Sequence, residues 1–158
     1  MIAVRRASAA DAEIVAALNA DVQAIHAAAM PWRFKVPGPD TFPPSEMVAL
    51  LATGNFAFFI GEVEGEPAGY LFLEIQRRPA TFQMFAYDMI YIHHVSVRPQ
   101  FRRQGVGRAL LDTAKAMARD LGMERMALDV WTFNDEARAF FDRYGLESYN
   151  ERRWMRVD

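Results

Sequence analysis

A loop with two glycines, between a predicted strand and a predicted helix, is the segment whose residues most clearly indicate chemistry. Met89–Val97 is predicted to be a buried strand, and Gly105 and Gly107 open the predicted helix Gly105–Leu121. Glycines let a backbone approach a ligand closely, and the first N–H groups of a helix have no intrahelical partner. These donors and the helix dipole together favour an anion, above all a phosphate.

The charges around this loop support the same interpretation. Between Arg98 and Arg108 there are four arginines and no acidic residue, although the chain carries a net charge of -2. Positive side chains at a helix N-terminus oppose the dipole, so a bound polyanion would compensate for them. The structural alternative is a capped surface helix with solvated arginines. A Gly-x-Gly pair alone would favour that alternative, but the strand, the arginines and the helix together favour an anion site.

Two large nucleotide-binding classes fit the loop poorly. A dinucleotide-binding turn would have a third glycine where Leu110 stands, and it would come early in a series of βαβ units. A P-loop would need Gly-Lys-Ser or Gly-Lys-Thr, which the sequence lacks. A module for NAD or ATP is therefore disfavoured, and the acidic net charge without a second basic patch argues against RNA.

Two motifs resemble one known family. Arg102–Gly107 reads Arg-Arg-Gln-Gly-Val-Gly and matches the Arg/Gln-x-x-Gly-x-Gly/Ala signature of the GNAT superfamily of N-acetyltransferases, and Val97–Pro99 before it is also typical. Asn134–Leu146 resembles the second family block, an Asn-x-x-Ala followed by an aromatic pair and a glycine. The resemblance covers nearly the whole chain. It implies one domain over residues 1–158, of the α/β class (α+β type), with a mostly antiparallel mixed sheet flanked by helices.

The resemblance implies an acyltransferase that moves an acetyl group from acetyl-coenzyme A to a primary amine. The amine would belong to a small molecule or to a peptide or protein, and it would attack directly through a tetrahedral intermediate. The cosubstrate would lie in a notch between strands 89–97 and 125–131, with its pyrophosphate on the amides of residues 103–108. A backbone N–H near residues 95–97 would stabilise the oxyanion. The implied cofactor-binding residues are Val95, Val97, Arg102, Arg103, Gln104, Gly105, Val106, Gly107, Arg108, Asn134 and Phe141.

Removing a proton from the amine requires a base, because an alkyl ammonium has a pKa near ~10.4. Histidine suits this role. Regular alternation would place Tyr91, His93 and Val95 on one face of the strand, whereas a bulge would bring His94 round instead. We favour His93, which stands where the arylalkylamine acetyltransferases of the family have histidine. Tyr91 stands where other members have a glutamate. The alternative is that one histidine packs in the core.

The position of the family's general-acid tyrosine corresponds to Phe141, which cannot donate a proton. Tyr144 lies three residues on, near the same helix face, and is a candidate substitute, although packing under the helix is the simpler role. A thiol with a pKa near ~8.5 also leaves as thiolate, and water can protonate it. Phe141 keeps open a second function class, a non-catalytic coenzyme A-binding sensor or regulatory module.

The resemblance implies that the acceptor enters beside the first helices and the loop that joins them. Aromatic side chains there favour an apolar or aromatic amine, or a peptide N-terminus, with help from cation–π contacts. The candidate substrate-binding residues are His26, Trp32, Phe34 and Glu74, and the loop over residues 77–87 adds Phe82, Phe85 and Tyr87.

Hydrophobic periodicity predicts the elements that position these residues, in the order β-α-α-β-β-β-α-β-α-β(-β). The predicted strands are Ile2–Arg6, Phe56–Val63, Ala68–Gln76, Met89–Val97, Arg125–Trp131 and one or two over Glu147–Val157. The predicted helices run from a Ser8 cap to about Met30, from a Ser45 cap to about Thr53, and over Gly105–Leu121 and Asp135–Tyr144.

Composition excludes several other classes of protein. The 158 residues are 52% hydrophobic and 24% charged, as in an ordinary globular domain. There is no cysteine, and the three histidines form no His-x-x-x-His pair, so we expect no metal site. The apolar run Phe56–Ile60 is too short to span a bilayer, and no signal core follows Met1, so we expect a cytoplasmic protein without membrane or nucleic-acid partners. The family resemblance also implies a possible homodimer, in which Tyr149, Trp154 and Met155 would form the contact.

Overall fold

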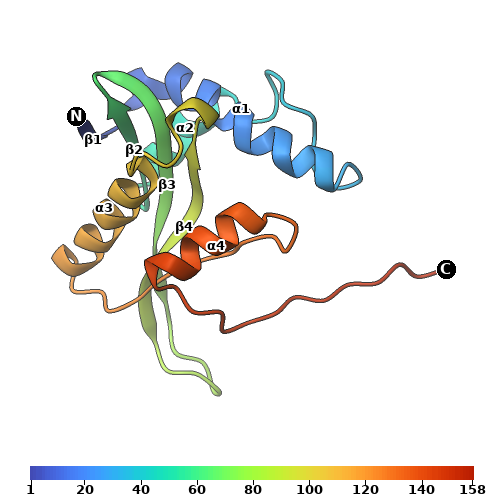
Figure 1. The fold of residues 1–158 in the computed structure, drawn as a ribbon. Coiled ribbons are helices and arrows are strands. Elements are labelled where there is room, and N and C mark those ends of the chain that lie inside the picture. The colour runs from blue at the N-terminus through green and yellow to red at the C-terminus, as the bar shows by residue number, and fades with distance from the viewer.

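A five-stranded mixed sheet with helices on both faces forms the body of the computed structural model, which describes residues 1–158 (Figure 1). The strands lie in the order β1-β2-β3-β4-β5, and every neighbouring pair is antiparallel except β4 and β5. The strands are β1 (Ile2–Arg6), β2 (Phe56–Val63), β3 (Glu66–Arg78), β4 (Tyr87–Val97) and β5 (Met126–Leu128). The helices are α1 (Ala12–Ala29), α2 (Pro44–Ala52), α3 (Val106–Asp120) and α4 (Asp135–Tyr144), with short 3-10 turns at Ala9–Asp11 and Pro99–Phe101.

Helix α1 begins and ends where its flanking residues require. Ser8 and Asp11 form a capping box before it, and Asp11 also accepts a hydrogen bond from Arg5 of β1 at 2.9 Å. The helix ends at Ala29, two residues before Pro31, because proline disfavours helical geometry in the residue that precedes it. The predicted first strand and first helix are therefore confirmed.

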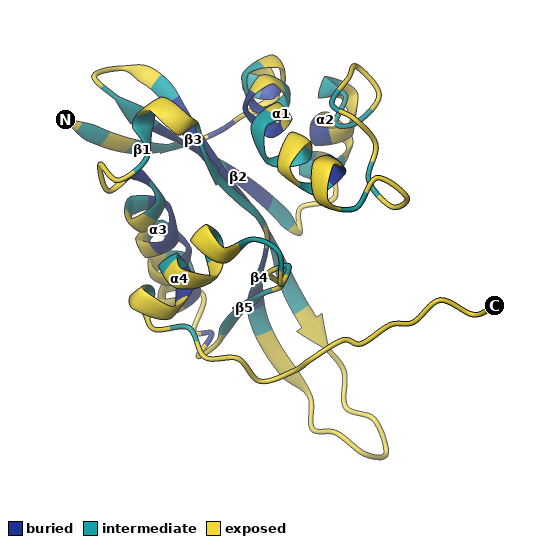
Figure 2. Ribbon diagram, turned by 45° about the vertical axis from the view of Figure 1, so that its right-hand side comes forward, coloured by how far each residue is buried: buried dark blue, intermediate teal, exposed yellow.

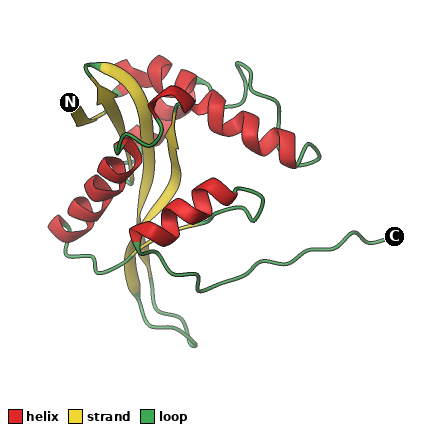
Figure 3. Ribbon diagram, in the orientation of Figure 1, coloured by secondary structure: helices red, strands yellow, loops and turns green.

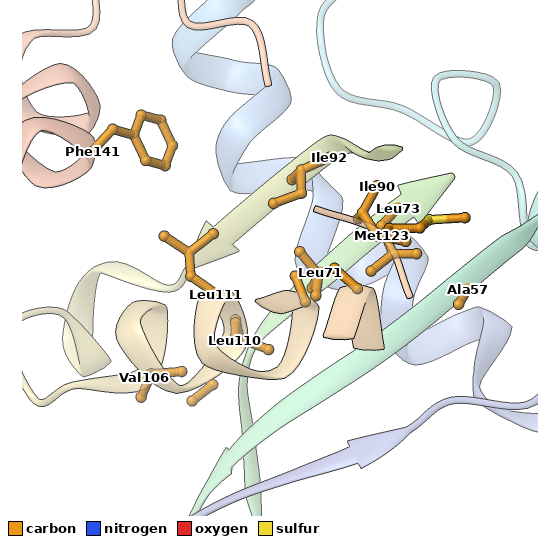
Figure 4. Close-up of a cluster of buried hydrophobic side chains, with 13 residues drawn as sticks. Ala57, Leu71, Leu73, Ile90, Ile92, Val106, Leu110, Leu111, Met123 and Phe141 are labelled. Carbon is orange, nitrogen blue, oxygen red and sulfur yellow. The ribbon is translucent and has the colours of Figure 1, made fainter. Parts of the chain in front are cut away.

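The sheet separates two packed layers, which differ in their helices and in their chemistry. Helix α3 packs on one face, where Val106, Leu110 and Leu111 join Leu71 and Leu73 in a buried apolar cluster (Figure 4). Helices α1 and α2 pack on the other face over a second cluster that includes Leu18, Met47, Phe58 and Tyr70. Figure 2 shows the buried residues concentrated in the upper half of the sheet and the sides of the helices that face it.

A bulge in β4 interrupts the register with β3. Phe72 lies opposite His94 and Leu73 lies opposite Ile92, so His93 is the extra residue on β4. A bulge places two successive residues against one on the partner strand and re-aims their side chains. Pairing of β4 with β5 also ends at Ile92 and Leu128, so the two strands separate beyond the bulge.

Three predicted elements need correction. Pro43, and not Ser45, is the N-cap residue of α2, whose first residue is Pro44. The fifth strand has three residues instead of the predicted seven, since its pairing with β4 ends where the bulge begins. Residues 147–157 form no strand, and the chain after α4 runs as an extended tail away from the sheet (Figures 1 and 3).

The hairpin of β3 and β4 extends well below the rest of the sheet (Figure 1). Its tip carries Phe82 and Phe85, which are 96% and 93% exposed. The expectation that this loop adds to an acceptor wall beside α1 was wrong for these two side chains, because the long strands carry them to the far end of the molecule. None of the helices combines the length and the apolar character that crossing a membrane requires.

Candidate functional site

The separation of β4 from β5 opens a small cavity of about 70 Å³ at the predicted notch. Its walls come from α1, from β4 around the bulge, from the segment that follows β5, and from α4. The lining residues are Val22, His26, Ile92, His93, His94, Val95, Leu128, Asp129, Val130, Trp131, Asn134, Ala137 and Phe141. All three histidines of the chain therefore line one cavity.

The bulge brings His93 and His94 to the same face of the sheet, although they are adjacent in sequence. The ring of Phe72 on β3 contacts both, stacked on His93 at 4.7 Å and edge-on to His94 at 5.3 Å between centroids. The sequence left two alternatives open: regular alternation would face His93 inward, and a bulge would face His94 inward. The structure has the bulge, and both histidines line the cavity. Two imidazoles are available at one site.

His93 is paired with a carboxylate. Its Nε2 lies 2.9 Å from Oε2 of Glu74, which also accepts a hydrogen bond from Gln76 at 3.0 Å. Burial raises the pKa of Glu74, but the hydrogen bonds from Gln76 and His93 outweigh it and lower the pKa overall. Glu74 is therefore ionised and holds the imidazole with Nε2 as donor and Nδ1 free to accept a proton.

His94 lies in a different environment. Its Nδ1 lies 2.8 Å from the Tyr70 hydroxyl, which accepts a hydrogen bond from Nδ2 of Asn19 at 2.9 Å. Burial, with smaller contributions from the neighbouring His93 and His26, lowers the pKa of His94 to about 4. His94 is therefore neutral near pH 7.

Tyr91 lies next to His93 on the same strand, with ring centroids 4.8 Å apart. Its hydroxyl donates a short hydrogen bond to Asp129, at the end of β5. Burial raises the pKa of Tyr91, and the carboxylate of Asp129 raises it further. Tyr91 therefore remains protonated, and it ties β4 to the segment after β5 at the edge of the cavity.

The loop over residues 102–108 has the backbone geometry of an anion site. Arg103 and Gly105 have positive φ angles of 62° and 97°, and Gly105 is the N-cap residue of α3. The six backbone N–H groups of residues 103–108 donate to no acceptor within the protein. Arg102 fixes the loop, since its Nε donates to the carbonyl of Val97 at 3.2 Å and it pairs with Glu136 of α4. The predicted anion site therefore has the required donors.

The comparisons with known proteins point to one family. Residues 20–146 match the acetyltransferase (GNAT) family. The chain belongs to the GNAT family. This confirms the family resemblance of the two sequence motifs, and the observed sheet with its flanking helices is a single GNAT-like α/β domain.

Individual GNAT relatives show how far the likeness extends. An uncharacterised N-acetyltransferase in the pepI 3' region of Lactobacillus delbrueckii subsp. lactis is 30% identical over 102 residues, which cover 65% of this chain and 57% of that protein. The chain spans about half the length of the first curated relatives it matches, 57% and 47%.

Solved structures share the fold at low identity. A tetramutant of the BH1408 protein from Bacillus halodurans has a TM-score of 0.92 at 21% identity, covering 98% of this chain and 99% of that one. The structure of AAC(6')-Iy in complex with a bisubstrate analogue, CoA-S-monomethyl-acetylneamine, has a TM-score of 0.77 at 18% identity, covering 100% and 99%.

An aromatic cluster lies beside the cavity, on the side of α1. The ring of His26 on α1 lies 5.0 Å from Phe34 and 5.7 Å from Phe133 between centroids, and Arg33 lies over the Trp131 ring at 4.8 Å. Burial lowers the pKa of His26, so its ring is a neutral aromatic surface near pH 7. The cluster joins the loop after α1 to the loop between β5 and α4.

Of the predicted site residues, eight lie at or beside the cavity, seven form the loop over residues 102–108, and three lie elsewhere. Tyr144 donates to Oδ1 of Asp112 on α3 at 2.8 Å, and this contact directs its hydroxyl away from the cavity. Trp32 is 64% exposed and contacts Trp154 of the tail, with ring centroids 5.2 Å apart. Val97 packs against the cluster under α3. Five predicted residues line the cavity itself, and their roles there stay predictions: His26, His93, Val95, Asn134 and Phe141.

Sequence reasoning missed Asn19, Tyr70 and Asp129 as site residues. Asn19, which is 3% exposed, is the one buried residue that is not of a hydrophobic type, and it interrupts the apolar stripe of α1 between Val15 and Val22. A buried amide in an apolar stripe requires a hydrogen-bond partner, so an asparagine at this position is a signal that the sequence itself contains. Nothing in the sequence pairs Asn19 with Tyr70, which lies 51 residues away.

Proposed function

We propose that the protein transfers an acetyl group from acetyl-coenzyme A to an amine, with the histidine-lined cavity as the reaction centre. The observation that carries this proposal is that the loop with the unpaired amides follows the strand that carries the histidines. The six unpaired amides of residues 103–108 lie at the start of α3, directly after β4, and β4 itself carries His93 and His94 at its bulge. One extended molecule with a phosphate end and a reactive end fits such a site.

The cosubstrate would be held mainly by backbone groups. Amides of residues 103–108 would bind the pyrophosphate, with exposed Arg103 and Arg108 adding charge. Beyond Ile92 the β5 side of β4 has no strand partner, so its backbone groups around Val95–Val97 are available to the pantetheine arm and to the oxyanion. The side chain of Asn134, which caps α4 by accepting from the Ala137 amide at 3.2 Å, lines the same cavity.

His93 would remove the proton from the attacking amine. Its Nε2 is committed to Glu74, which leaves Nδ1 as the acceptor and lets the carboxylate stabilise the imidazolium that forms. The amine nitrogen then attacks the thioester carbon, the carbon–sulfur bond breaks, and coenzyme A leaves as thiolate. Phe141 is buried and offers no proton, and Tyr144 is bonded to Asp112, so water would protonate the thiolate.

The acceptor would be an amine with an apolar or aromatic body, belonging to a small molecule or to a peptide. His26, Phe34 and Trp131 present ring faces and edges toward the cavity side of α1, where a cation or an aromatic ring can pack. The carboxylates nearest the base, Glu74 and Asp129, would attract the ammonium form. The protein of the same fold in complex with a coenzyme A-linked acetylneamine shows that this fold can accept an amine joined to the cofactor.

A panel of amines tests this function. Release of free thiol from acetyl-coenzyme A would be followed with an aromatic alkylamine, an aliphatic diamine, an amino sugar and a peptide with a free N-terminus, because a chain without cysteine adds no thiol background. We expect turnover, with the aromatic alkylamine or the peptide preferred. Binding of coenzyme A with no turnover of any amine would instead support a non-catalytic sensor or regulatory module.

The extended tail would mediate a homodimer. Tyr149 and Met155 are 79% and 80% exposed, and Trp154 makes a ring contact only with Trp32. Pairing with a second copy would cover these side chains. Sedimentation of the full chain and of a chain ending at residue 146 tests this, with a dimer that becomes a monomer on truncation as the expected result and equal masses as the contrary one.

A further inference from the structure

The side of the sheet under α1 holds a buried chain of hydrogen bonds that ends at the cavity. Asn19 of α1, Tyr70 of β3 and His94 of β4 are joined in this order at 2.9 and 2.8 Å. Asn19 is 3% exposed and Tyr70 is fully buried. Burying these polar groups is unfavourable unless all of them are satisfied, so each proton in the chain must have a definite acceptor.

The proton count fixes the tautomer of His94. Nδ2 of Asn19 donates to the Tyr70 oxygen, so the hydroxyl proton of Tyr70 is left with one acceptor, Nδ1 of His94. An imidazole whose Nδ1 accepts carries its proton on Nε2 when it is neutral. The bulge at His93 is what turns His94 toward Tyr70, since regular alternation would place it on the opposite face.

The remaining nitrogen of His94 is open to the cavity. Nε2 has no hydrogen-bond partner in the protein, and no buried side-chain nitrogen or oxygen is left without a partner. Nε2 is therefore accessible, and the ring belongs to the cavity wall. An N–H with a fixed direction thus faces the space where the thioester would lie.

We propose that His94 is a neutral hydrogen-bond donor to the acetyl oxygen, and that Tyr70 and Asn19 are positioning residues that hold its Nε2–H tautomer. This role rests on the proposed acetyl transfer. The donor strengthens its hydrogen bond as negative charge develops on the oxygen, and no proton is transferred, so His94 and Tyr70 keep their protons throughout. The two neighbouring histidines then divide the work, since His93 accepts the proton and His94 stabilises the oxyanion.

The ionisable groups around His94 agree with a neutral ring. Tyr70 lies on β3, His93 on β4, His26 on α1 and Asp129 after β5. The carboxylate nearest the histidines on β3, Glu74, is bonded to His93 and Gln76, so no acidic partner is hydrogen-bonded to His94. A neutral donor of this kind would not itself produce the acidic limb of the rate profile.

The tautomer can be read without any substrate. A long-range proton–nitrogen spectrum of the protein labelled with ¹⁵N-histidine contains only three imidazoles, since the chain has three histidines, and His94→Gln assigns one of them. At pH 7 we expect the Nε2–H pattern for His94. Tyr70→Phe, which keeps the ring and removes the donor, should give a mixture of tautomers, whereas Tyr149→Phe in the exposed tail should leave the His94 pattern unchanged. An Nδ1–H pattern or an imidazolium at pH 7 overturns the proposal.

Rates separate a donor from a base. We expect His94→Ala to lower kcat by roughly 10²–10³, the usual cost of one oxyanion donor, with the KM for acetyl-coenzyme A little changed. His94→Gln keeps an N–H donor and should recover part of the loss with an unchanged acidic limb. Equal losses in both variants, or a limb that disappears in His94→Gln, would show a base instead. If the wild type turned over no amine, the acetyl-transfer proposal would fail, and the spectrum would still decide the tautomer.

Discussion

The two faces of the sheet differ in what they bury. Under α3 all thirteen buried residues of the cluster are hydrophobic, whereas under α1 the hydroxyl of Tyr70 and the amide of Asn19 lie among apolar side chains. The first face supports the loop with the unpaired amides of residues 103–108, and the second contacts His94 through Tyr70. Under the proposed function, the apolar face would hold the cosubstrate loop in place, and the polar face would hold the imidazole of His94. One face holds α3 and its amides in place. On the other face the burial of polar groups costs free energy, but it fixes the geometry of a hydrogen-bond donor.

The largest effect should come from the polar face. We expect His93→Gln to lower kcat by about 10²–10⁴, because a positioned base contributes a factor of that size. Steady-state kinetics on the best amine of the panel measures the change. The matched control is Glu124→Gln, an exposed residue before β5 that does not line the cavity, which should keep the wild-type rate. An unchanged kcat in His93→Gln would remove His93 as the base.

Truncating a side chain on the apolar face should damage stability instead. Leu110 is completely buried, so Leu110→Ala should lower the free energy of unfolding by about 2–5 kcal/mol. Leu121→Ala, at the exposed C-cap of the same helix, should change it by no more than about 0.5 kcal/mol. Urea denaturation compares the two variants. Equal losses would show that the core under α3 is packed less tightly than the structure indicates.

Acid should destabilise the polar face selectively. The pKa of His94 falls from about 6.5 in an unfolded chain to about 4 in the folded one, so the unfolded state binds more protons between these values. The contribution of the neutral His94 to the free energy of unfolding is therefore fully present above pH 6.5. It decreases as the pH falls, by about 3 kcal/mol near pH 4.

The variant His94→Gln isolates this contribution. Urea midpoints between pH 4 and 7 should depend less steeply on pH in His94→Gln than in the wild type. Burial also lowers the pKa of His26, so part of the slope should remain. Identical slopes in the two proteins would contradict a buried neutral His94.

The smallest effect should come from the contact between α3 and α4. A Cβ added to Gly107 would lie 3.2 Å from the ring of Phe140, so Gly107→Ala should lower the unfolding free energy by about 1 kcal/mol. Combining it with Phe140→Leu should recover part of the loss, because the smaller side chain makes room. Strict additivity of the two substitutions in urea denaturation would show that the predicted crowding is absent.

The sequence predicts the apolar face better than the polar one. The strand Phe56–Val63 and the helix Asp135–Tyr144 have the bounds that periodicity and the following glycine indicate. The bulge at His93 is different, because both registers of that strand satisfy its apolar pattern and only pairing with β3 decides between them.

The remaining departures have the same origin. The fifth strand is short because β4 turns away at the bulge, and Tyr144 faces Asp112 because a shift of three residues along a helix rotates the side chain toward α3. The alternating pattern of residues 147–157 suits a strand, but no neighbouring strand in the chain pairs with it. Each of these depends on contacts between distant segments.

Thermal unfolding with acetyl-coenzyme A, coenzyme A, NAD and ATP in parallel shows which of these ligands the folded protein binds. Ligand at about 100 times its Kd adds about 2.7 kcal/mol to stability, which raises the Tm of a chain of this size by several degrees. We expect such a shift with the two coenzyme A ligands and little or none with NAD and ATP. A larger shift with NAD or ATP, or no shift with coenzyme A, would contradict the assignment of the loop over residues 102–108 to this cosubstrate.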